Sequence, residues 1–170
     1  MGQPVVRIIG TGGTIDSESE TSDTKKSVFT ETHIPQMLQV ARITSEVIFE
    51  SLMMKDSLDI TEQDRQLILK RCSSCPERNV VITHGTHTIA ETAKVLGPNI
   101  LDKTVVLVGA MVPFNQNESD ALFNLGYAIA SARQLPSGVY IAMNGKAFPW
   151  NDVKKNREKL VFENLKKTVE

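Results

Sequence analysis

The chain has 170 residues, of which 41% are hydrophobic. A chain of this length can bury a core without disulfide bonds or structural metal ions to stabilise it. A formal net charge of −1 and an aromatic content of only 5% give no reason to expect nucleic acid or an anionic membrane as a partner. No apolar run is long enough to cross a bilayer and no signal-type segment opens the chain, so we expect a single cytoplasmic domain over residues 1–170.

Five apolar runs predict β-strands, and segments with helical spacing separate most of them. Strands are expected at residues 5–9, 47–49, 80–83, 104–108 and 138–143. Helices are expected at residues 34–42, 61–71, 89–96 and 118–133. Thr61 with Asp64 forms a capping-box pattern that opens the second helix. Residues 153–170, which include a charged tail at 157–170, are predicted to be a helix with frayed ends.

A polar stretch rich in Ser, Thr and charged residues occupies residues 16–33, with almost nothing to bury. Loops of this length inside a compact domain are usually lids or binding loops. We therefore predict a flexible lid over residues 16–33, with a disordered insertion as the alternative.

Apolar strands that alternate with helices indicate a parallel sheet covered by helices on both faces. We predict an α/β fold of three layers, a doubly wound, flavodoxin-like single domain with about five strands in the order 2-1-3-4-5. Ligands of such folds bind beyond the carboxyl ends of the strands, beside the switch between strands 1 and 3. One residue of interest follows each strand in turn: Thr14, Ser57, Thr86, Ala110 and Lys155. We therefore expect these five residues along one edge of the sheet.

Two cysteine and histidine motifs are open to a different interpretation. Cys72-Ser73-Ser74-Cys75 followed by His84-Gly85-Thr86-His87 resembles a zinc site, but both spacings are tighter than those of zinc fingers. A redox pair should open a helix, whereas these cysteines close one just before Pro76. We therefore expect two cysteines packed at the end of a helix, and no metal.

The glycine-rich stretch Gly10-Thr11-Gly12-Gly13-Thr14 follows the first predicted strand directly. A dinucleotide fingerprint would need glycine at position 15 and a helix immediately afterwards, but Ile15 and the polar lid stand there. No Walker-type lysine follows either. The stretch is instead compatible with nucleophilic catalysis by threonine.

A threonine hydroxyl attacks poorly at neutral pH unless a base or a cation assists it. Lys155 could accept or stabilise a proton through Thr86. Backbone N–H groups at Gly13-Thr14 and at the start of the helix after Thr86 could form an oxyanion hole. That set suits hydrolysis of an amide or ester through a covalent intermediate, and a ligand-binding domain with hydrogen-bonded turn threonines is the alternative.

Four motifs of this chain resemble the signatures of the bacterial-type L-asparaginase/glutaminase family, in that family's order. They are Thr11-Gly12-Gly13-Thr14-Ile15, Thr83-His84-Gly85-Thr86-x-Thr88, Val108-Gly109-Ala110-Met111-x-Pro113 and Asp152-Val153-x-Lys155. The resemblance covers about residues 5–156. It implies an amidohydrolase that needs no cofactor and releases ammonia from L-asparagine through an acyl-threonine intermediate.

The resemblance implies a role for each matching residue. Thr14 corresponds to the threonine that forms the acyl intermediate, and Thr86 to a second catalytic threonine that works with the lysine matched by Lys155. Ser57 corresponds to the serine that holds the substrate's α-carboxylate, and Ala110 to a backbone contact with the side-chain amide. The family's sites are built between subunits, so the resemblance also implies a homo-oligomer, a dimer or a tetramer.

Two positions depart from the pattern of the family. His87 stands where the family usually has the aspartate that binds the substrate's α-ammonium group. A protonated imidazole would repel that group, so we expect weaker asparagine binding at acid pH; in the alternative, His87 caps its helix or turns into an interface. Leu58 stands where many periplasmic-type members have glutamine. Because loss of this polar contact should affect the longer glutamine more, we expect asparagine to be preferred over glutamine.

The lid and the end of the chain depart further from the family. The only tyrosines, Tyr127 and Tyr140, fall in a predicted helix and a predicted strand, and Phe29 in the lid cannot relay a proton. The family's smaller second domain, which gives a neighbouring site an acidic residue, has no counterpart, so the chain resembles a short form made of the N-terminal domain alone. Candidates to replace that acid are Asp16, Glu18 and Glu20. The alternatives are a catalytically impaired amino-acid or amide-binding protein and a subunit completed by another chain.

Overall fold

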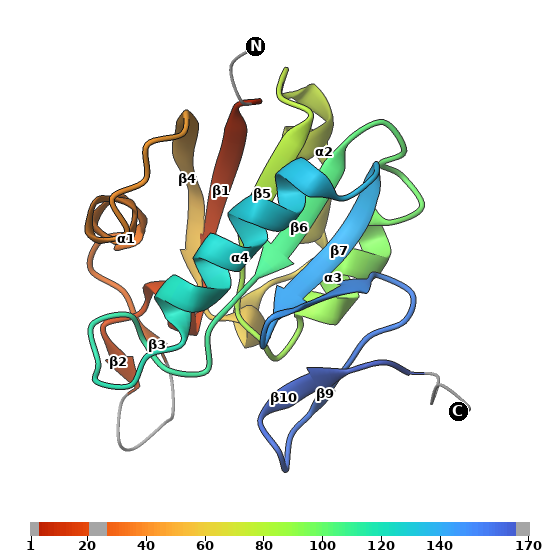
Figure 1. The fold of residues 1–170 in the computed structure, drawn as a ribbon. Helices are drawn as coiled ribbons and strands as arrows, with labels where there is room; N and C mark the ends of the chain where they lie inside the picture. The colour runs from red at the N-terminus through yellow and green to blue at the C-terminus, as the bar shows by residue number, and fades with distance from the viewer. Residues whose placement is uncertain (1–3, 21–26, 166–170) are drawn as a thin grey trace.

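The computed structural model describes residues 4–20 and 27–165 and has a six-stranded sheet at its centre (Figure 1). The strands lie in the order β4-β1-β5-β6-β7-β8. The first five of these are parallel, and β8 pairs antiparallel with β7. Their bounds are β1 Val6–Gly12, β4 Val47–Lys55, β5 Asn79–Thr83, β6 Thr104–Val108, β7 Gly138–Met143 and β8 Lys146–Pro149.

The predicted order 2-1-3-4-5 is confirmed for the five parallel strands. β8 is an addition, because residues 144–152 were expected to be a loop. Asn144 and Gly145 both adopt positive φ, 55° and 74°, and this tight turn sends the chain back along β7. The sheet is therefore mixed, with one antiparallel strand at its edge.

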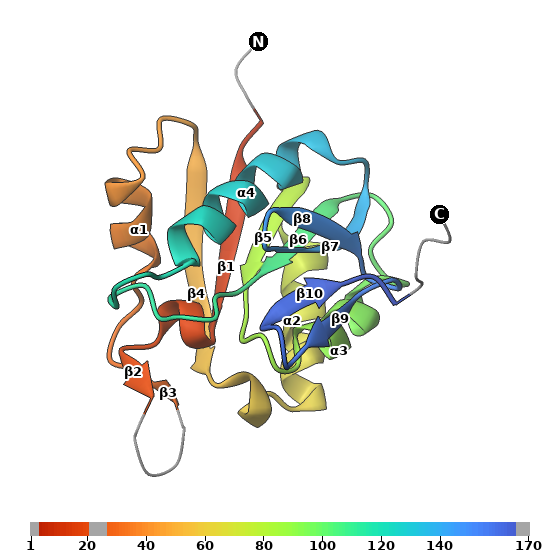
Figure 2. The same cartoon turned by 60° about the horizontal axis from the view of Figure 1, so that its bottom comes forward.

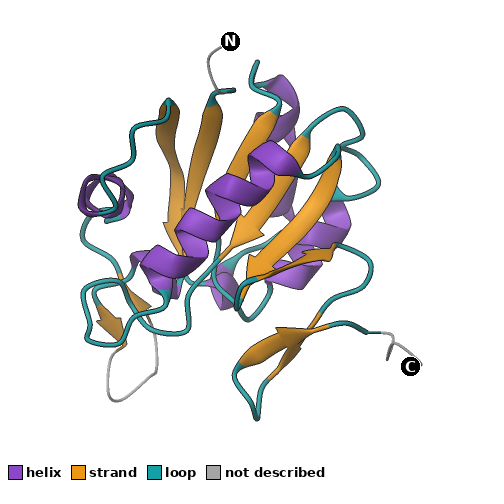
Figure 3. Ribbon diagram, viewed as in Figure 1, coloured by secondary structure: helices purple, strands orange, loops and turns teal. Residues whose placement is uncertain are grey.

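Helices cover both faces of the sheet, so the fold has the three layers that the sequence predicts (Figure 3). Alternate residues of the central strands supply the two cores: Ile8 and Val81 face α1 and α4, whereas Ile9 and Ile82 face α2 and α3. Among the described residues, none of the helices has the length and apolar character needed to cross a membrane. The helix bounds are α1 Ile34–Val40, α2 Glu62–Ser74, α3 Ile89–Leu96 and α4 Ala121–Gln134.

The sequence predicts most element ends to within a few residues, but two strands run further. β1 continues through Gly12 and β4 through Lys55, with a shift in their register just before these residues. The predicted capping box of α2 is present: Thr61 Oγ1 accepts a hydrogen bond from the Asp64 N–H at 3.2 Å, and Asp64 Oδ2 accepts one from the Thr61 N–H at 2.8 Å. The longer strands carry backbone pairing up to the loops that follow them.

The predicted C-terminal helix is wrong. Lys154–Asn156 (β9) and Val161–Glu163 (β10) form an antiparallel hairpin instead. The Asn156 side chain accepts two backbone N–H groups of the turn, at 3.1 and 3.0 Å, and so builds the reversal. Phe162 is only 4% exposed and joins the same core as α2 and α3, which anchors an extended segment where a helix would have had little to bury. Residues 166–170 lie outside the described part of the chain.

The predicted lid contains short elements of its own. It begins in a 3-10 helix, η1 (Thr14–Asp16), and continues into the paired strands β2 (Ser19–Glu20) and β3 (Ser27–Val28). This hairpin projects from the body of the molecule (Figure 2). Residues 21–26 lie outside the described part, so the predicted flexibility of the lid stays a prediction.

Candidate active site

The residues predicted to form a site follow the carboxyl ends of the parallel strands, at the edge that Figure 2 turns toward the viewer. Thr14 lies just after β1, Ser57 after β4, Thr86 after β5 and Ala110 after β6. Lys155 comes from β9, beyond the antiparallel strand. This is the edge at which open α/β sheets bind their ligands.

The loops that carry Thr14, Ser57 and Thr86 meet at two glycines. A Cβ atom on Gly13 would collide with the backbone of Gly85. A Cβ atom on Gly85 would in turn lie 2.6 Å from both Cβ and Oγ of Ser57. Because nothing larger than hydrogen fits at these positions, the glycines allow three loops to come into direct contact.

Thr14 is partly exposed and stands on a fixed backbone. Gly13, with φ of 81°, donates its N–H to the Lys55 carbonyl at 2.9 Å. Ser17 donates both its N–H and its hydroxyl to the Thr14 carbonyl, at 3.2 and 3.1 Å. The expected contribution of the Gly13 N–H to an oxyanion hole is therefore wrong, since the neighbouring strand already uses that donor.

Lys155 and Thr86 come together across the edge of the sheet. Lys155 Nζ lies 2.7 Å from Thr86 Oγ1, within hydrogen-bond distance. Thr86 is 4% exposed, and a Cβ atom on Gly109 would lie 2.9 Å from its methyl carbon, so the hydroxyl has little freedom to turn away. The C-terminal hairpin matters here, because β9, rather than a loop or helix, delivers the lysine.

His84 is buried beneath the loop of Thr86. Its Nδ1 lies 2.9 Å from the Gly85 carbonyl oxygen and its Nε2 lies 2.8 Å from Thr92 Oγ1. Because a carbonyl oxygen only accepts, Nδ1 carries the proton and Nε2 accepts from the Thr92 hydroxyl. Burial lowers the pKa of His84 to about 4, so the ring is neutral at neutral pH. From the sequence, His84 is assigned no role of its own, although the residue stands in the possible metal motif and in the second of the four family motifs.

Ser57 opens a short 3-10 helix, η2 (Ser57–Asp59), and is 2% exposed. Its carbonyl accepts a hydrogen bond from the Thr88 hydroxyl at 2.6 Å, which ties η2 to the start of α3. Leu58 is 67% exposed at this edge. His87 is also exposed and immediately precedes Thr88, the N-cap residue of α3.

Ala110 is fully buried, and α4 holds the backbone on both sides of it. Asp120, immediately before α4, accepts the Met111 N–H at 2.9 Å. Asn124, one turn later, donates its Nδ2 to the Gly109 carbonyl at 3.1 Å. Sequence reasoning missed both residues, and their spacing of four at the start of a predicted helix is the signal that places them on one face.

The candidate acids of the lid have different surroundings. Asp16 is 1% exposed, and its Oδ1 accepts the His33 N–H at 2.5 Å and the Thr32 hydroxyl at 3.1 Å. Burial raises the pKa of this carboxyl group. Asp16 thus connects the two ends of the lid by hydrogen bonds. Because it is buried and already bonded, it is a poor candidate to replace the missing acid. Glu18 is partly exposed, and the side chain of Glu20 lies outside what the structure describes.

The two cysteines pack at the end of α2, as expected. Cys72 and Cys75 are free and buried, and Cys75 Sγ lies 3.2 Å from the Cys72 carbonyl oxygen. Burial raises the pKa of the Cys72 thiol to about 12, so it is not a reactive thiolate at neutral pH. Within residues 4–20 and 27–165, no three His, Cys, Asp or Glu side chains are grouped so as to hold a metal ion.

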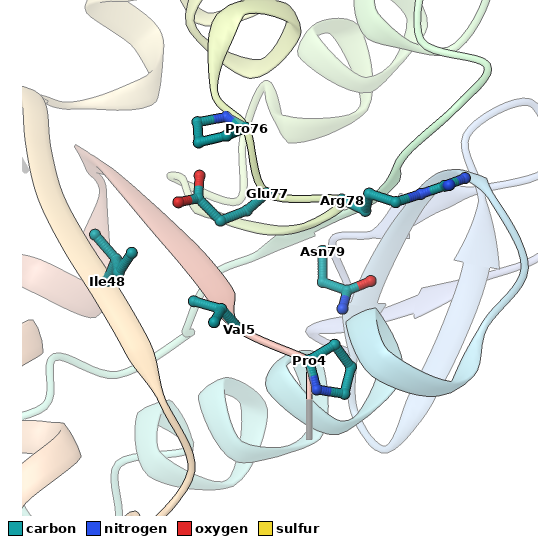
Figure 4. Close-up of a pocket in the computed structure, with 7 residues that line it drawn as sticks. All are labelled: Pro4, Val5, Ile48, Pro76, Glu77, Arg78 and Asn79. Atoms are coloured by element: carbon teal, nitrogen blue, oxygen red, sulfur yellow. The ribbon is translucent and has the colours of Figure 1, made fainter. Parts of the chain in front are cut away.

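A hollow of about 320 Å³ lies at the opposite edge of the sheet (Figure 4). Val5, Ile48 and Asn79 line it near the amino ends of β1, β4 and β5, so it does not coincide with the candidate active site. A second hollow, of about 330 Å³, is lined by residues of the loop after Ala110. None of the five predicted site residues lines this second hollow, although Met111 follows Ala110 directly in the chain.

Comparison with protein families and curated proteins gives matches over most of the chain. The family model described as Asparaginase, N-terminal matches residues 5–162. L-asparaginase 2 of Escherichia coli (strain K12) is 34% identical over 166 residues, which cover 89% of this chain and 46% of that protein. Glutaminase-asparaginase of Acinetobacter glutaminasificans is 34% identical over 168 residues, which cover 88% of this chain and 49% of that protein. A subunit of the glutamyl-tRNA(Gln) amidotransferase of Saccharolobus islandicus (strain L.S.2.15 / Lassen #1) is 33% identical over 144 residues, which cover 78% and 31%.

Solved structures give matches of similar extent. The thermostable L-asparaginase from Thermococcus kodakarensis superposes with a TM-score of 0.81 at 29% identity, covering 94% of this chain and 51% of that one. The probable cytoplasmic L-asparaginase from Campylobacter jejuni gives a TM-score of 0.77 at 29% identity, covering 95% and 51%. The chain therefore spans about half the length, or less, of the relatives it matches.

Proposed function

Because this chain belongs to the asparaginase family, we propose that it hydrolyses the side-chain amide of L-asparagine to L-aspartate and ammonia, with Thr14 as the nucleophile. The observation that carries the proposal is the 2.7 Å contact between Lys155 Nζ and Thr86 Oγ1, in a loop that packs directly on the loop of Thr14. A threonine needs such an assisting group to attack an amide.

In the proposed reaction the Thr14 hydroxyl oxygen bonds to the amide carbon of the substrate. The proton that the hydroxyl loses passes by way of Thr86, whose oxygen Lys155 contacts, to the amide nitrogen. The carbon–nitrogen bond then breaks and ammonia leaves, while an aspartyl ester stays on Thr14. Water cleaves this ester, releases L-aspartate and restores the Thr14 hydroxyl.

Three further residues are proposed to hold the substrate. The hydroxyl of Ser57 would take the α-carboxylate, His87 would face the α-ammonium group, and the Ala110 carbonyl would accept the side-chain amide. Since Ala110 is fully buried, its carbonyl becomes available only after a small shift of the loop around it.

We propose a preference for asparagine over glutamine, on the basis of Leu58. This side chain is exposed at the edge of the site and offers no polar group to a substrate. Since one relative bears the name glutaminase-asparaginase, the preference has to be measured on this chain. Comparable kcat/KM values for the two amides would contradict it.

Assembly and location are proposed from the resemblance of the sequence motifs and from one neighbour. We propose a homo-oligomer, a dimer or a tetramer, that acts in the cytoplasm and binds L-asparagine as its small-molecule partner. The structural neighbour from Campylobacter jejuni is named a probable cytoplasmic L-asparaginase, which supports the proposed location. The mass of the purified protein in solution and its distribution between cell fractions test these two statements.

Ammonia release from L-asparagine by the purified chain tests the proposed activity. We expect release by the unaltered chain, loss with Thr14→Ala, and retention with Thr104→Ala, since Thr104 begins β6 at the opposite edge of the sheet. Binding of asparagine without turnover would replace the proposal with an amide-binding protein. Turnover only in the presence of another polypeptide would indicate a subunit that a second chain completes.

A further inference from the structure

His84 is hydrogen-bonded to Gly85, the glycine at which the three loops of the site meet. Its ring is fully buried and lies under Gly85, the residue that packs against both Gly13 and Ser57. The histidine does not reach the surface at which a substrate would bind. Any effect of His84 on the reaction must therefore be indirect, through the backbone of Gly85, to which it is hydrogen-bonded.

The hydrogen bonds of His84 define how it holds that backbone. The Thr92 hydroxyl, on α3, donates to Nε2 at 2.8 Å, and this leaves the ring proton on Nδ1. Nδ1 then donates to the Gly85 carbonyl at 2.9 Å. A rigid helix is thus connected through one ring to one peptide group of the site.

The peptide group concerned joins Gly85 to Thr86. Because a peptide unit is planar and trans, fixing the direction of the Gly85 carbonyl also fixes the direction of the Thr86 N–H, which points the opposite way. Gly85 has no side chain to limit its rotation, so an external hydrogen bond is needed to select one orientation. His84 supplies this hydrogen bond, while close contacts with Gly13 and Ser57 restrict the position of Gly85.

We propose that His84 is a positioning residue for the reaction, which fixes the Gly85–Thr86 peptide so that Thr86 meets Lys155 and Ser57 stays in place. The inference rests on the proposed asparagine hydrolysis. It assigns to His84 neither proton transfer nor contact with the substrate. The neutrality of the buried ring is consistent with this role, since a neutral ring keeps Nε2 as an acceptor for Thr92.

Two amide variants separate the two hydrogen bonds. The amide nitrogen of asparagine, a donor, is as many bonds from Cβ as Nδ1 of histidine. The amide oxygen of glutamine, an acceptor, is as many bonds from Cβ as Nε2. His84→Asn can therefore keep the donor to Gly85 and loses the contact with Thr92, and His84→Gln does the reverse. Each variant loses the ring and one hydrogen bond, so they serve as matched controls for stability.

The kinetics of ammonia release test the role. We expect His84→Gln to lower kcat/KM about tenfold or more, with most of the loss in kcat, because the buried Gly85 carbonyl is left without its donor. His84→Asn should stay within about threefold of the unaltered chain at a similar melting temperature. Equal losses in the two variants, or losses that follow their melting temperatures, would overturn the proposal.

A second measurement needs no variant. Nitrogen-15 NMR of the ring nitrogens distinguishes the two neutral tautomers, and the chain has only three histidines to assign. We expect the proton of His84 on Nδ1, and a proton on Nε2 would overturn the proposal because Nδ1 could not then donate to Gly85. Absence of ammonia release from the unaltered chain would overturn the proposed function and this role with it, whereas an active chain with the wrong tautomer would overturn only the role of His84.

Discussion

Lys155 Nζ lies 2.7 Å from Thr86 Oγ1, although 69 positions separate the two residues in the chain. Thr86 follows the third parallel strand of the sheet and Lys155 lies in the C-terminal hairpin. The hairpin stays in place because Phe162, which pairs with Lys155 across β9 and β10, is buried in the core. Packing of the residue paired with Lys155 thus determines where the assisting amine lies.

Loss of the Lys155 amine should slow the reaction strongly. We expect Lys155→Met to lower kcat for asparagine hydrolysis by about 100-fold or more, the range for a positioned group that assists proton transfer. Lys154→Met is the matched control, because Lys154 precedes it in the same strand but pairs with Glu163 at 3.2 Å on the exposed side. A similar kcat in both variants would contradict the role of Lys155.

A side chain at Gly85 should disturb the site through Ser57. In Gly85→Ala the new Cβ would lie 2.6 Å from Ser57 Cβ and Oγ, so we expect a rise in KM for asparagine and a loss of about 1–3 kcal/mol in the free energy of unfolding. Gly126→Ala is the control: nothing lies within 4 Å of a Cβ there, and alanine in α4 should stabilise the fold by about 0.5–1 kcal/mol. Unchanged KM in Gly85→Ala would show that the contact is not restrictive.

The stability of the fold should fall on mild acidification because of His84. Its pKa is lowered to about 4 in the folded chain from the ordinary value of 6.5, so between these values the unfolded chain binds the additional proton. The free energy of unfolding therefore decreases as the pH falls from about 6.5 to about 4, by a total of about 3 kcal/mol from this residue. Asp16 opposes the trend, because its raised pKa favours the folded state on acidification.

Denaturant unfolding at a series of pH values isolates the contribution of His84. We expect the unaltered chain to lose more stability between pH 6.5 and pH 4 than His84→Gln, whose side chain does not titrate. Identical slopes for the two proteins in this window would mean that His84 is not kept neutral by burial.

The histidine at position 87, where the family usually has aspartate, should affect KM for asparagine rather than kcat. His87 is exposed beside Thr86, where an imidazole that gains a proton would repel the α-ammonium group of asparagine. We expect KM for asparagine to rise on acidification, and His87→Asp to lower KM about tenfold and to remove this dependence. A KM that is unchanged by the substitution and flat between pH 5 and 9 would exclude the contact.

The order of the five parallel strands could be predicted from the sequence because continuous apolar runs such as Val80–Ile82 indicate strands buried on both faces. Topology then places Thr14, Ser57 and Thr86 at one edge without further information. β8 was missed although Asn144-Gly145, a typical two-residue hairpin turn, indicates it in the sequence. The C-terminal hairpin could not be predicted, because it depends on a single buried residue. In the sequence, Phe162 is one apolar residue in a charged tail. Only the structure shows that it packs into the core.

The supporting residues of the site were harder to predict than the residues proposed for chemistry. His84 stood in a motif that suggested zinc, and only its burial beside Thr92 indicates a structural bond to Gly85. Likewise the Gly13 N–H was expected to face a substrate, but β4 runs far enough for Lys55 to accept it. Both outcomes depend on tertiary contacts, which local patterns do not contain.

Capture of the covalent intermediate tests the central claim, attack by Thr14, most directly. The chain is mixed with L-asparagine, quenched in acid within milliseconds to seconds, digested and analysed by mass spectrometry. We expect one aspartyl group on the Thr14 peptide, located at Thr14 by fragmentation and absent from Thr14→Ala. An aspartyl group on Thr86 instead, or undiminished ammonia release by Thr14→Ala, would contradict the account.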